Sequence, residues 1–573
     1  MKCLIFFTLV SSSILFLSTA RKEITQNEKS TGSLTAANGI TYCAPSFDPA
    51  KMDAGNAPLF NGLGDLHYNI STTSTKAQRY FDQGLTLLYA FNHGEAGRSF
   101  KAAIRHDSTC AMPYWGLAMV LGPNYNAPLD PSSLVDINDA INKAIKYSAK
   151  VSASEKALIN ALRLRFPEQE VKDMSAYNQS YVAAMKVAHE QFPNDVNIAA
   201  LYADAMMNEH PWDLWLRDGT PQPWTPVIVE TIEKLLAGTP DHVGGNHMYI
   251  HVMEASPEAR KALPSADKLR DMLPAAGHIV HMPSHIYIRT GSYHKGVLAN
   301  KKATVADSSY IAQCKVQGIY PMMYYPHNIH FLAACAFLEG NSKLAIEAAW
   351  SVARHADKTY INENAAIQHY SIIPYYVLVQ TGKWTEILLL QQPDTSLRYP
   401  LAVWHYARGM AFAARNEMDA AANELTALQE IGKEQKLKTL LIWDINSAAQ
   451  LTQIAADVLS GEIHSKQGRF DEAIQFLNHA KEIEDGLMYQ EPPDWFFSTR
   501  HTLGHILLKA KKFGEAENVY KEDMVTYPEN GWALMGLHKS LLGQHKNKEA
   551  NAVLKRFNKA WKWADVRINS SRI

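Results

Sequence analysis

Residues 502–528 read TLGHILLKAKKFGEAENVYKEDMVTYP, and this stretch carries the pattern that decides the fold. Small residues stand at Gly504 and Ala516, aromatic residues stand at Phe513 and Tyr520, and Pro528 closes the stretch. Small residues let two helices approach closely, aromatic side chains fill the space between them, and a proline cannot continue a helix. The stretch therefore predicts a pair of packed helices joined by a short turn.

The same arrangement recurs along the chain. Two further registers are Gly461, Gly468, Phe470, Ala473 and Ala480, and Gly84, Ala96, Phe100 and Ala103. This pattern resembles the tetratricopeptide repeat, a helix–turn–helix unit of about 34 residues. The resemblance covers most of residues 75–560 and implies an all-α solenoid of stacked helix pairs. We expect loop insertions at residues 209–225 and 308–323, a C-terminal tail over residues 561–573, and almost no strand.

The N-terminus has the features of a cleavable signal peptide. Lys2 precedes an apolar run, and Ser18, Thr19 and Ala20 supply small residues before a charged pair. We expect residues 1–20 to be removed, residues 21–74 to form a polar, extended lead-in, and the mature protein to be secreted or exported. A retained signal anchor is the alternative. No later stretch is long enough to span a bilayer, so we expect no stable membrane insertion.

Charge and cysteine usage exclude several classes of function. The formal net charge of the 573 residues is −1, and the tryptophans are accompanied by no basic stripe, so we expect no nucleic-acid partner. The cysteines that follow the leader are Cys43, Cys110, Cys314 and Cys335. None of them forms a C-x-x-C pair, which speaks against a thiolate metal clamp.

Two histidine pairs share one spacing and lie one repeat apart. The first is His247-Met-Tyr-Ile-His251, and the second, His281-Met-Pro-Ser-His285, follows 34 residues later. Residues four apart lie on one face of a helix, and equivalent positions of stacked repeats face the same space. The four imidazoles should therefore converge. Pro283 can kink or start a helix, and if it starts one, His278 and His281 would lie on the preceding loop.

The resemblance extends this set to eight histidines. In tetratricopeptide repeats the second, fifth and ninth positions of the first helix line the concave groove. In the central units, residues 243–385, these positions hold His278, His327 and His369 (second), His247, His281 and His330 (fifth), and His251 and His285 (ninth). We take these eight side chains as candidate metal ligands.

The chemistry of the cluster follows from its donor type. Imidazole nitrogen suits copper, zinc and iron, whereas calcium and magnesium prefer oxygen. Eight imidazoles are more than one ion needs. A second ion can therefore be accommodated, and we expect the site to be either mononuclear or dinuclear. Glu254, one turn beyond His251, is a candidate ligand, an orienting partner of an imidazole, or a tentative catalytic base. The candidates for outer hydrogen bonding are Asn246, Tyr249, Tyr287, Tyr324 and Tyr325.

Two functions of different class follow. The histidine-bearing segments are similar to those of largely uncharacterised exported, bacterial-type tetratricopeptide repeat proteins, and this likeness supplies no reaction. The leading hypothesis is a secreted metalloprotein with a histidine-rich mono- or dinuclear metal centre in its concave groove, where we also expect a small-molecule or peptide ligand. Copper or iron in this site would favour an oxidoreductase. Zinc, with Glu254 as the catalytic base, would favour a hydrolase. The alternative is a peptide- or protein-binding repeat scaffold whose histidine-lined groove is pH-sensitive.

Overall fold

The computed structural model describes residues 57–314 and 320–573. The predicted signal peptide at residues 1–20 and most of the predicted lead-in lie outside the described residues. Residues 57–74, the described part of the lead-in, form no helix or strand.

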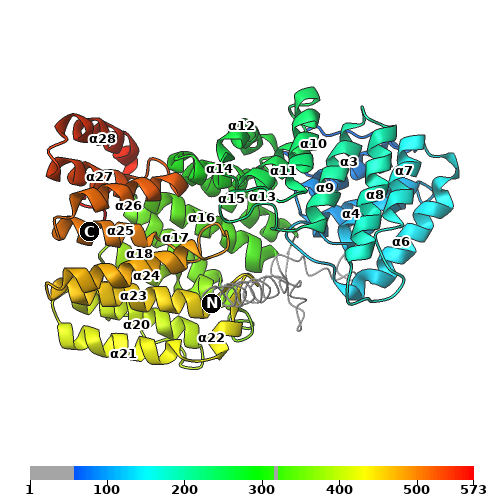
Figure 1. Ribbon diagram of the computed structural model, residues 1–573. Helices are drawn as coiled ribbons and strands as arrows, with labels where there is room; N and C mark the ends of the chain where they lie inside the picture. The colour runs from blue at the N-terminus through cyan, green and yellow to red at the C-terminus, as the bar shows by residue number, and fades with distance from the viewer. Residues whose placement is uncertain (1–56, 315–319) are drawn as a thin grey trace, which may run out of the picture. The chain divides into compact units, whose positions relative to one another are not determined.

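The described chain is built from helices (Figure 1). The first group consists of α3 (Thr75–Tyr89), α4 (His93–His106), α5 (Ala111–Leu121), α6 (Leu134–Tyr147), α7 (Ala153–Leu162), α8 (Ser175–Gln191), α9 (Val196–Glu209) and α10 (Thr225–Gly238). The central group consists of α11 (Val243–Met253), α12 (Leu263–Met272), α13 (Gly277–His281), α14 (Pro283–Arg289), α15 (Tyr293–Cys314), α16 (Tyr325–Leu338), α17 (Ser342–His355), α18 (Ala365–Gln380) and α19 (Trp384–Leu388). The last group consists of α20 (Arg398–Ala414), α21 (Met418–Gly432), α22 (Lys436–Thr439), α23 (Ala448–Lys466), α24 (Phe470–Asp485), α25 (Thr499–Lys509), α26 (Phe513–Thr526), α27 (Gly531–Gly543) and α28 (Asn547–Ala560).

Short elements complete the description. Four 3-10 turns and one π-helical turn cover Pro131–Ser133, Ser148–Lys150, Ala259–Ala262, Trp561–Trp563 and, for the π turn, Tyr320–Tyr324. Within residues 57–314 and 320–573, the only strands are β1 (Leu441–Ile442) and β2 (Asn446–Ser447), which pair antiparallel. The predicted all-α fold is thus confirmed.

Successive helices pack in pairs, and each pair packs on the next. The pairs include α3 with α4, α16 with α17, α20 with α21, α23 with α24, and α27 with α28. Helices α4 and α5, α17 and α18, and α24 and α25 join one pair to the following one. Contacts of this kind between neighbours in sequence are those of a helical-repeat array.

The stretch 502–528 forms α25, the following turn and α26, as its pattern predicts. A Cβ atom added at Gly504 would lie 2.4 Å from Cζ of Tyr520, and one at Gly536 would lie 2.1 Å from the same atom. The aromatic ring of α26 therefore fills the space between two helices that only glycine allows so close. Helix α26 ends at Thr526, just before Pro528.

One predicted loop is confirmed and the other is partly helical. Residues 210–224 connect α9 to α10, as expected. In contrast, α15 continues to Cys314 and so enters the predicted insertion at residues 308–323. The extension is held by buried contacts, because the Asp307 carboxylate accepts a hydrogen bond from Asn328 at 2.6 Å and the Tyr310 hydroxyl donates to Asn92 at 3.2 Å.

The tail at the end of the chain is packed against the repeats. Asp565 accepts hydrogen bonds from the backbone N–H groups of Ser342 and Lys343 at 2.7 and 2.9 Å, at the start of α17. Ser571 is buried and donates to the His501 carbonyl at 2.6 Å. Arg572 pairs with Glu462 of α23 at 2.8 Å. These contacts tie the tail to three separate repeats.

Among the described residues, no helix is both long and apolar enough to cross a membrane. The thiols of Cys110, Cys314 and Cys335 are free.

Candidate metal centre

The structure places the eight candidate histidines on five helices of the central group. Helix α11 carries His247 and His251, α13 carries His278 and His281, α14 carries His285, α16 carries His327 and His330, and α18 carries His369. All of them are buried except His327, which is partly exposed.

Three of these histidines form the first triad, which consists of His247, His251 and His278. One ring nitrogen from each lies within 4.8 Å of the other two. Nδ1 of His247 donates to the Tyr89 carbonyl at 2.6 Å, and this fixes the lone pair on Nε2. Nε2 of His247 and Nε2 of His251 have no hydrogen-bond partner among the described residues. The triad therefore presents unsatisfied imidazole nitrogens to a common point.

His281, His285 and His327 form the second triad under the same 4.8 Å criterion. Nδ1 of His281 donates to Oδ1 of Asn300 at 2.7 Å, and the amide nitrogen of Asn300 is itself fixed by the Gly296 carbonyl at 2.9 Å. Nε2 of His281 lies 3.0 Å from Nε2 of His285. Two nitrogens bound to one ion at roughly 2.0–2.1 Å lie about 3–3.5 Å apart, so this pair has the spacing of neighbouring ligands.

The remaining two candidates form a separate pair outside both triads. The rings of His330 and His369 have centroids 5.9 Å apart. His330 stacks on Phe496 at 5.0 Å, and Nδ1 of His369 lies 3.0 Å from the Tyr399 hydroxyl. Both ring nitrogens of His330 and Nε2 of His369 lack hydrogen-bond partners within the described chain.

Pro283, which lies between His281 and His285, starts a new helix, but the histidines before it do not lie on a loop. Helix α14 begins at Pro283, and the five-residue helix α13 precedes it, so His278 and His281 remain helical. Helix α13 lies very close to α15. A Cβ atom added at Gly277 would lie only 1.8 Å from Oδ1 of Asp307. Glycine at this position is what allows α13 to bring its two histidines to the centre.

Glu254 connects the two triads. Its Oε1 accepts from Nδ1 of His251 at 3.0 Å, and its Oε2 contacts Nδ1 of His285. Glu254 is the C-cap residue of α11, where its backbone N–H donates to the Ile250 carbonyl, and the residue is 1% exposed. Both oxygens are therefore engaged by histidines, one from each triad. A carboxylate that holds Nδ1 of an imidazole leaves Nε2 for a metal, which is the usual orienting arrangement around metal ligands.

Glu491 is a further acidic residue at the centre that the sequence pattern does not identify as a site residue. It lies between α24 and α25, and its Oε2 is 3.3 Å from Nδ1 of His285. Together with Glu254 and His285 it forms a third group whose ligand atoms lie within 4.8 Å of one another. The only sequence signal was the Pro-stiffened acidic and aromatic turn that begins at Glu491.

Most imidazoles of the centre are held neutral. Burial, followed by neighbouring imidazoles, holds the pKa of His247, His278 and His281 well below the usual range. Burial also lowers the pKa of His327 to about 3 and that of His369 to about 3. Neutral imidazole is the form that binds metal, so these side chains need lose no proton to act as ligands.

His285 is the exception. Burial lowers its pKa, but the Glu254 and Glu491 carboxylates outweigh this effect and raise the pKa to about 9. Conversely, burial raises the pKa of Glu254 while His285 and His251 lower it, to about 2. With a pKa of about 9, His285 is protonated near neutral pH and can donate from Nε2 to Nε2 of His281, 3.0 Å away. A metal ion would take the place of that proton between the same two nitrogens.

The outer hydrogen-bond partners differ from those expected. The hydroxyl of Tyr249 donates to Glu233 and that of Tyr287 to Asp267, both at 2.6 Å and away from the centre. Each tyrosine stands two residues beyond a triad histidine, and residues two apart do not share a helix face. Of the expected set, Tyr324 contacts the centre, with its ring 5.2 Å from that of His278.

Aromatic rings enclose both triads. The ring of Phe91 lies 4.5, 5.7 and 5.8 Å from those of His247, His251 and His278. Phe331 lies 4.7 and 4.4 Å from His281 and His285. Apolar surroundings limit access of water and strengthen electrostatic interactions at the centre.

Comparison with known families supports the repeat assignment. The family described as "Tetratricopeptide repeat" matches residues 458–485, which cover the end of α23 and most of α24. The chain thus carries a tetratricopeptide repeat, and the superfamily that the sequence pattern indicates is confirmed. No curated protein matches the sequence significantly.

Solved structures with similarity to the chain include several repeat proteins. The Cut9–Hcn1 hetero-tetramer of the APC/C is 15% identical, with 84% of this chain and 76% of that chain covered and a TM-score of 0.29. The human IFIT1 dimer with m7Gppp-AAAA is 12% identical, with 87% and 92% covered and a TM-score of 0.29. Yeast Tom70 is 13% identical, with 86% and 92% covered and a TM-score of 0.28. Likeness at this level carries no functional information.

Proposed function

We propose that this tetratricopeptide repeat protein is a metalloprotein that binds two transition-metal ions, one in each histidine triad. The observation that supports the proposal most directly is the grouping of six imidazoles into two adjacent sets of three, each with its ligand atoms within 4.8 Å. Three histidines and an open position form a common transition-metal site. His251 and His285 have rings 6.1 Å apart, so the two ions would be neighbours in a dinuclear centre.

The environment of the triads supports ligand roles over packing roles. A buried imidazole nitrogen without a hydrogen-bond partner costs free energy, and such orphans are rare in folded proteins. Within the described residues, the first triad alone holds four of them: Nε2 of His247, Nε2 of His251 and both nitrogens of His278. A metal ion would satisfy one nitrogen of each residue.

The position of Glu254 speaks against a hydrolase in which this residue activates a water molecule. Both oxygens of Glu254 are engaged by His251 and His285, which supports an orienting role for this residue over that of a base for water. The triads contain nitrogen donors and no sulfur, a set that suits copper, zinc and iron. We therefore propose a copper, zinc or iron centre, with an oxidoreductase activity if the ion is copper or iron.

The experiment that tests the metal proposal measures stoichiometry. Purified protein would be stripped of metal, titrated with Cu²⁺ and with Zn²⁺, desalted, and analysed for bound metal. We expect two ions per wild-type chain, one in His247→Asn, one in His281→Asn, and none in the double variant. His479→Asn is the matched control, because the side chain of His479 is 56% exposed and pairs with Asp457 away from the triads.

The proposal would be wrong if wild-type protein retained no metal, or if the two triad variants bound as much metal as His479→Asn. Circular dichroism of each variant would show whether it is folded. A loss of metal without a loss of helix supports direct ligation.

We also propose that the protein is exported by cleavage after Ala20. The support is the charged, apolar and small-residue order of residues 1–20. N-terminal sequencing of protein recovered from outside the producing cell would give Arg21 as the first residue. An intact Met1 on the recovered protein would contradict cleavage.

The second candidate function is a peptide- or protein-binding scaffold, which the repeat match at residues 458–485 favours. Tetratricopeptide and related repeats form extended binding surfaces. The two functions are compatible, because the triads occupy the central helices alone.

A further inference from the structure

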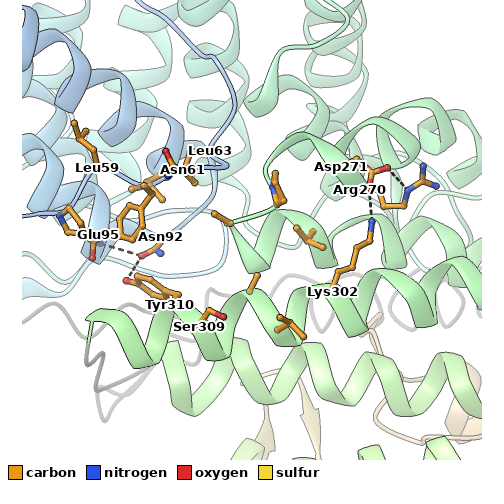
Figure 2. Close-up of a pocket in the computed structure, with 18 of the residues that line it drawn as sticks. Leu59, Asn61, Leu63, Asn92, Glu95, Arg270, Asp271, Lys302, Ser309 and Tyr310 are labelled. Carbon is orange, nitrogen blue, oxygen red and sulfur yellow. Dashed lines mark hydrogen bonds and ion pairs between the residues drawn. The ribbon is translucent and has the colours of Figure 1, made fainter.

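A cavity of about 860 Å³, separate from the histidine triads, lies between the first and central groups of helices. Figure 2 shows it bordered by residues 58–63, by the α3–α4 turn and α4, by the end of α12, and by α15. Ligand sites in proteins have about this size, roughly 300–1,000 Å³. We refer to it as the α4–α15 cavity.

The middle of the α4–α15 cavity is apolar. Leu63, Leu87, Val280 and Val305 line it, together with Pro274 and Ala275. Helix α15 contributes residues three and four positions apart, from Lys301 to Tyr310, which is the spacing of a single helix face. An apolar body is therefore required of any ligand that fills the space.

The two ends of the cavity differ in chemistry, because cations predominate at one end and a buried carboxylate, paired with Arg98, lies at the other. Arg270, Asp271 and Lys302 lie at one end, and Asn92, Glu95 and Tyr310 at the other (Figure 2). At the first end Arg270 and Lys302 both pair with Asp271, at 2.9 and 2.8 Å. Arg270 also lies 3.7 Å from Asp267, which is outside the cavity lining and pairs with Lys295. Lys301 also lines the cavity and is exposed, with no ion-pair partner within the described residues. This end is therefore net positive.

Glu95 gives the other end a specific requirement. Its side chain is 1% exposed, and Oε2 accepts from Arg98 at 3.2 Å. The Cys314 thiol also lies beside the carboxylate, but Oε1 has no hydrogen-bond partner at suitable geometry among the described residues. Burying a carboxylate oxygen against an alkyl chain would leave it unsatisfied, so the ligand needs a hydrogen-bond donor here. A fatty carboxylate could pair with the cations at the positive end, but its alkyl chain has no hydrogen-bond donor for Oε1 of Glu95.

We propose that the α4–α15 cavity binds a short apolar peptide with free ends, its ammonium group at Glu95 and its carboxylate at Lys301, Lys302 and Arg270. Such a peptide has the three required parts: a cation that donates hydrogen bonds, an apolar body and an anion. A single amino acid has the two charges but is too small to fill a cavity of about 860 Å³.

The proposal does not depend on metal binding, although the two sites share a wall. Helix α13 places Val280 in the cavity, while the adjacent His281 belongs to the second triad. Failure of one proposal therefore leaves the other intact, because peptide binding and metal content are measured separately.

The test uses the full chain, isothermal titration calorimetry and four probes. These are the tripeptide Leu-Leu-Leu with free ends, its N-acetyl form, its C-terminal amide, and decanoate. We expect the free tripeptide to bind and each capped form to bind about tenfold more weakly or worse, since each cap removes one charge-assisted interaction. Decanoate should bind more weakly than the free tripeptide.

Variants assign each end of the peptide to its side of the cavity. Lys301→Glu should weaken binding of the free tripeptide about tenfold and leave binding of the amide unchanged. Glu95→Gln should do the same for the free tripeptide and leave the N-acetyl form unchanged. Lys433→Gln is the control, because Lys433 is exposed at the end of α21 and pairs with Glu430 at 2.6 Å, away from the cavity lining.

Three results would overturn the proposal: no binding of the free tripeptide, equal binding of the capped forms, or an affinity that neither cavity variant changes. Tighter binding of decanoate than of the tripeptide would make the site one for lipid carboxylates instead. Lys301 is exposed, so Lys301→Glu tests the site even if Glu95→Gln fails to fold.

Discussion

Glu254 is buried between two imidazoles that belong to different triads, with one oxygen for each. A carboxylate in this position fixes which ring nitrogen carries the proton, and so directs the other nitrogen toward the metal. It also supplies the negative charge that would offset two metal ions in an otherwise neutral set of imidazoles. At the scale of single residues, the centre depends on this side chain as much as on its ligands.

Glu254→Gln should weaken metal binding at both triads by about 10–100-fold, because an amide holds an imidazole N–H less strongly than a carboxylate does. Competition with a chelator of known affinity would measure this. Glu258→Gln is the control, since Glu258 is exposed and pairs with Lys261 on the surface. Equal affinities in the two variants would show that Glu254 has no role in positioning the ligands.

Gly277→Ala should destabilise the fold by about 1–3 kcal/mol, because the new Cβ atom would overlap Asp307. The overlapped carboxylate cannot turn aside freely, since Tyr320 donates to it at 2.7 Å and Asn328 at 2.6 Å. Urea unfolding would measure the loss.

Gly514→Ala in α26 is the control, because nothing lies within 4 Å of the added Cβ atom at this position. It should be neutral or stabilising by about 0.5–1 kcal/mol, and the same loss in both variants would contradict the overlap.

At the scale of elements, the segment between α24 and α25 connects the last group of helices to the centre. Glu491 of this segment reaches His285, and Phe496 stacks on His330. Asp494 anchors the segment by accepting a hydrogen bond from Asn446 at 2.8 Å. Burial raises the pKa of Asp494 from 3.8 to about 7.

Asp494 should make the protein less stable as the pH rises. Its pKa is higher in the folded chain than in the unfolded one, so the folded state binds the proton more tightly. The resulting stability is complete below about pH 4 and is lost as the pH rises toward 7. Over that window the change is up to about 4 kcal/mol.

Asp494→Asn removes this group and should flatten the loss of stability between pH 4.5 and pH 7, as measured by urea unfolding at both values. Asp485→Asn is the control, because the side chain of Asp485 is 48% exposed. An unchanged pH dependence in Asp494→Asn would show that the buried carboxyl does not titrate in this window.

At the scale of the whole molecule, the two triads join helices that belong to successive repeats. The ligands come from α11, α13, α14 and α16, and Glu491 comes from the distant segment before α25. Metal binding to such a site acts on the folded chain and not on the unfolded one. It therefore adds stability by mass action.

Removal of metal should lower the melting temperature at pH 7.5. At a thousandfold excess of metal over the dissociation constant, binding contributes about 4 kcal/mol, and a strong chelator would abolish that contribution. Differential scanning calorimetry of loaded and chelated protein would measure the shift. The His247→Asn/His281→Asn double variant should show no chelator effect. An unchanged wild-type midpoint, in protein shown to hold no metal after chelation, would mean that metal does not support the fold.

The sequence by itself determined the repeat architecture and the set of candidate ligands. Helix pairs follow from the small and aromatic residues at positions such as Gly504 and Tyr520, because their spacing reflects local helix packing. The 34 residues between His247 and His281 equal one repeat length, so the sequence predicts that these histidines occupy equivalent positions of neighbouring repeats. These are properties of periodicity, which a single sequence displays directly.

Only the tertiary structure decided how the histidines divide and what orients them. Six of the eight form two triads, while His330 and His369 lie apart. The partners that fix their ring nitrogens are the Tyr89 carbonyl, Asn300 and Glu254, and Glu491 reaches His285 from the far end of the chain. Such contacts depend on how helices distant in sequence approach one another, and no local spacing encodes that approach.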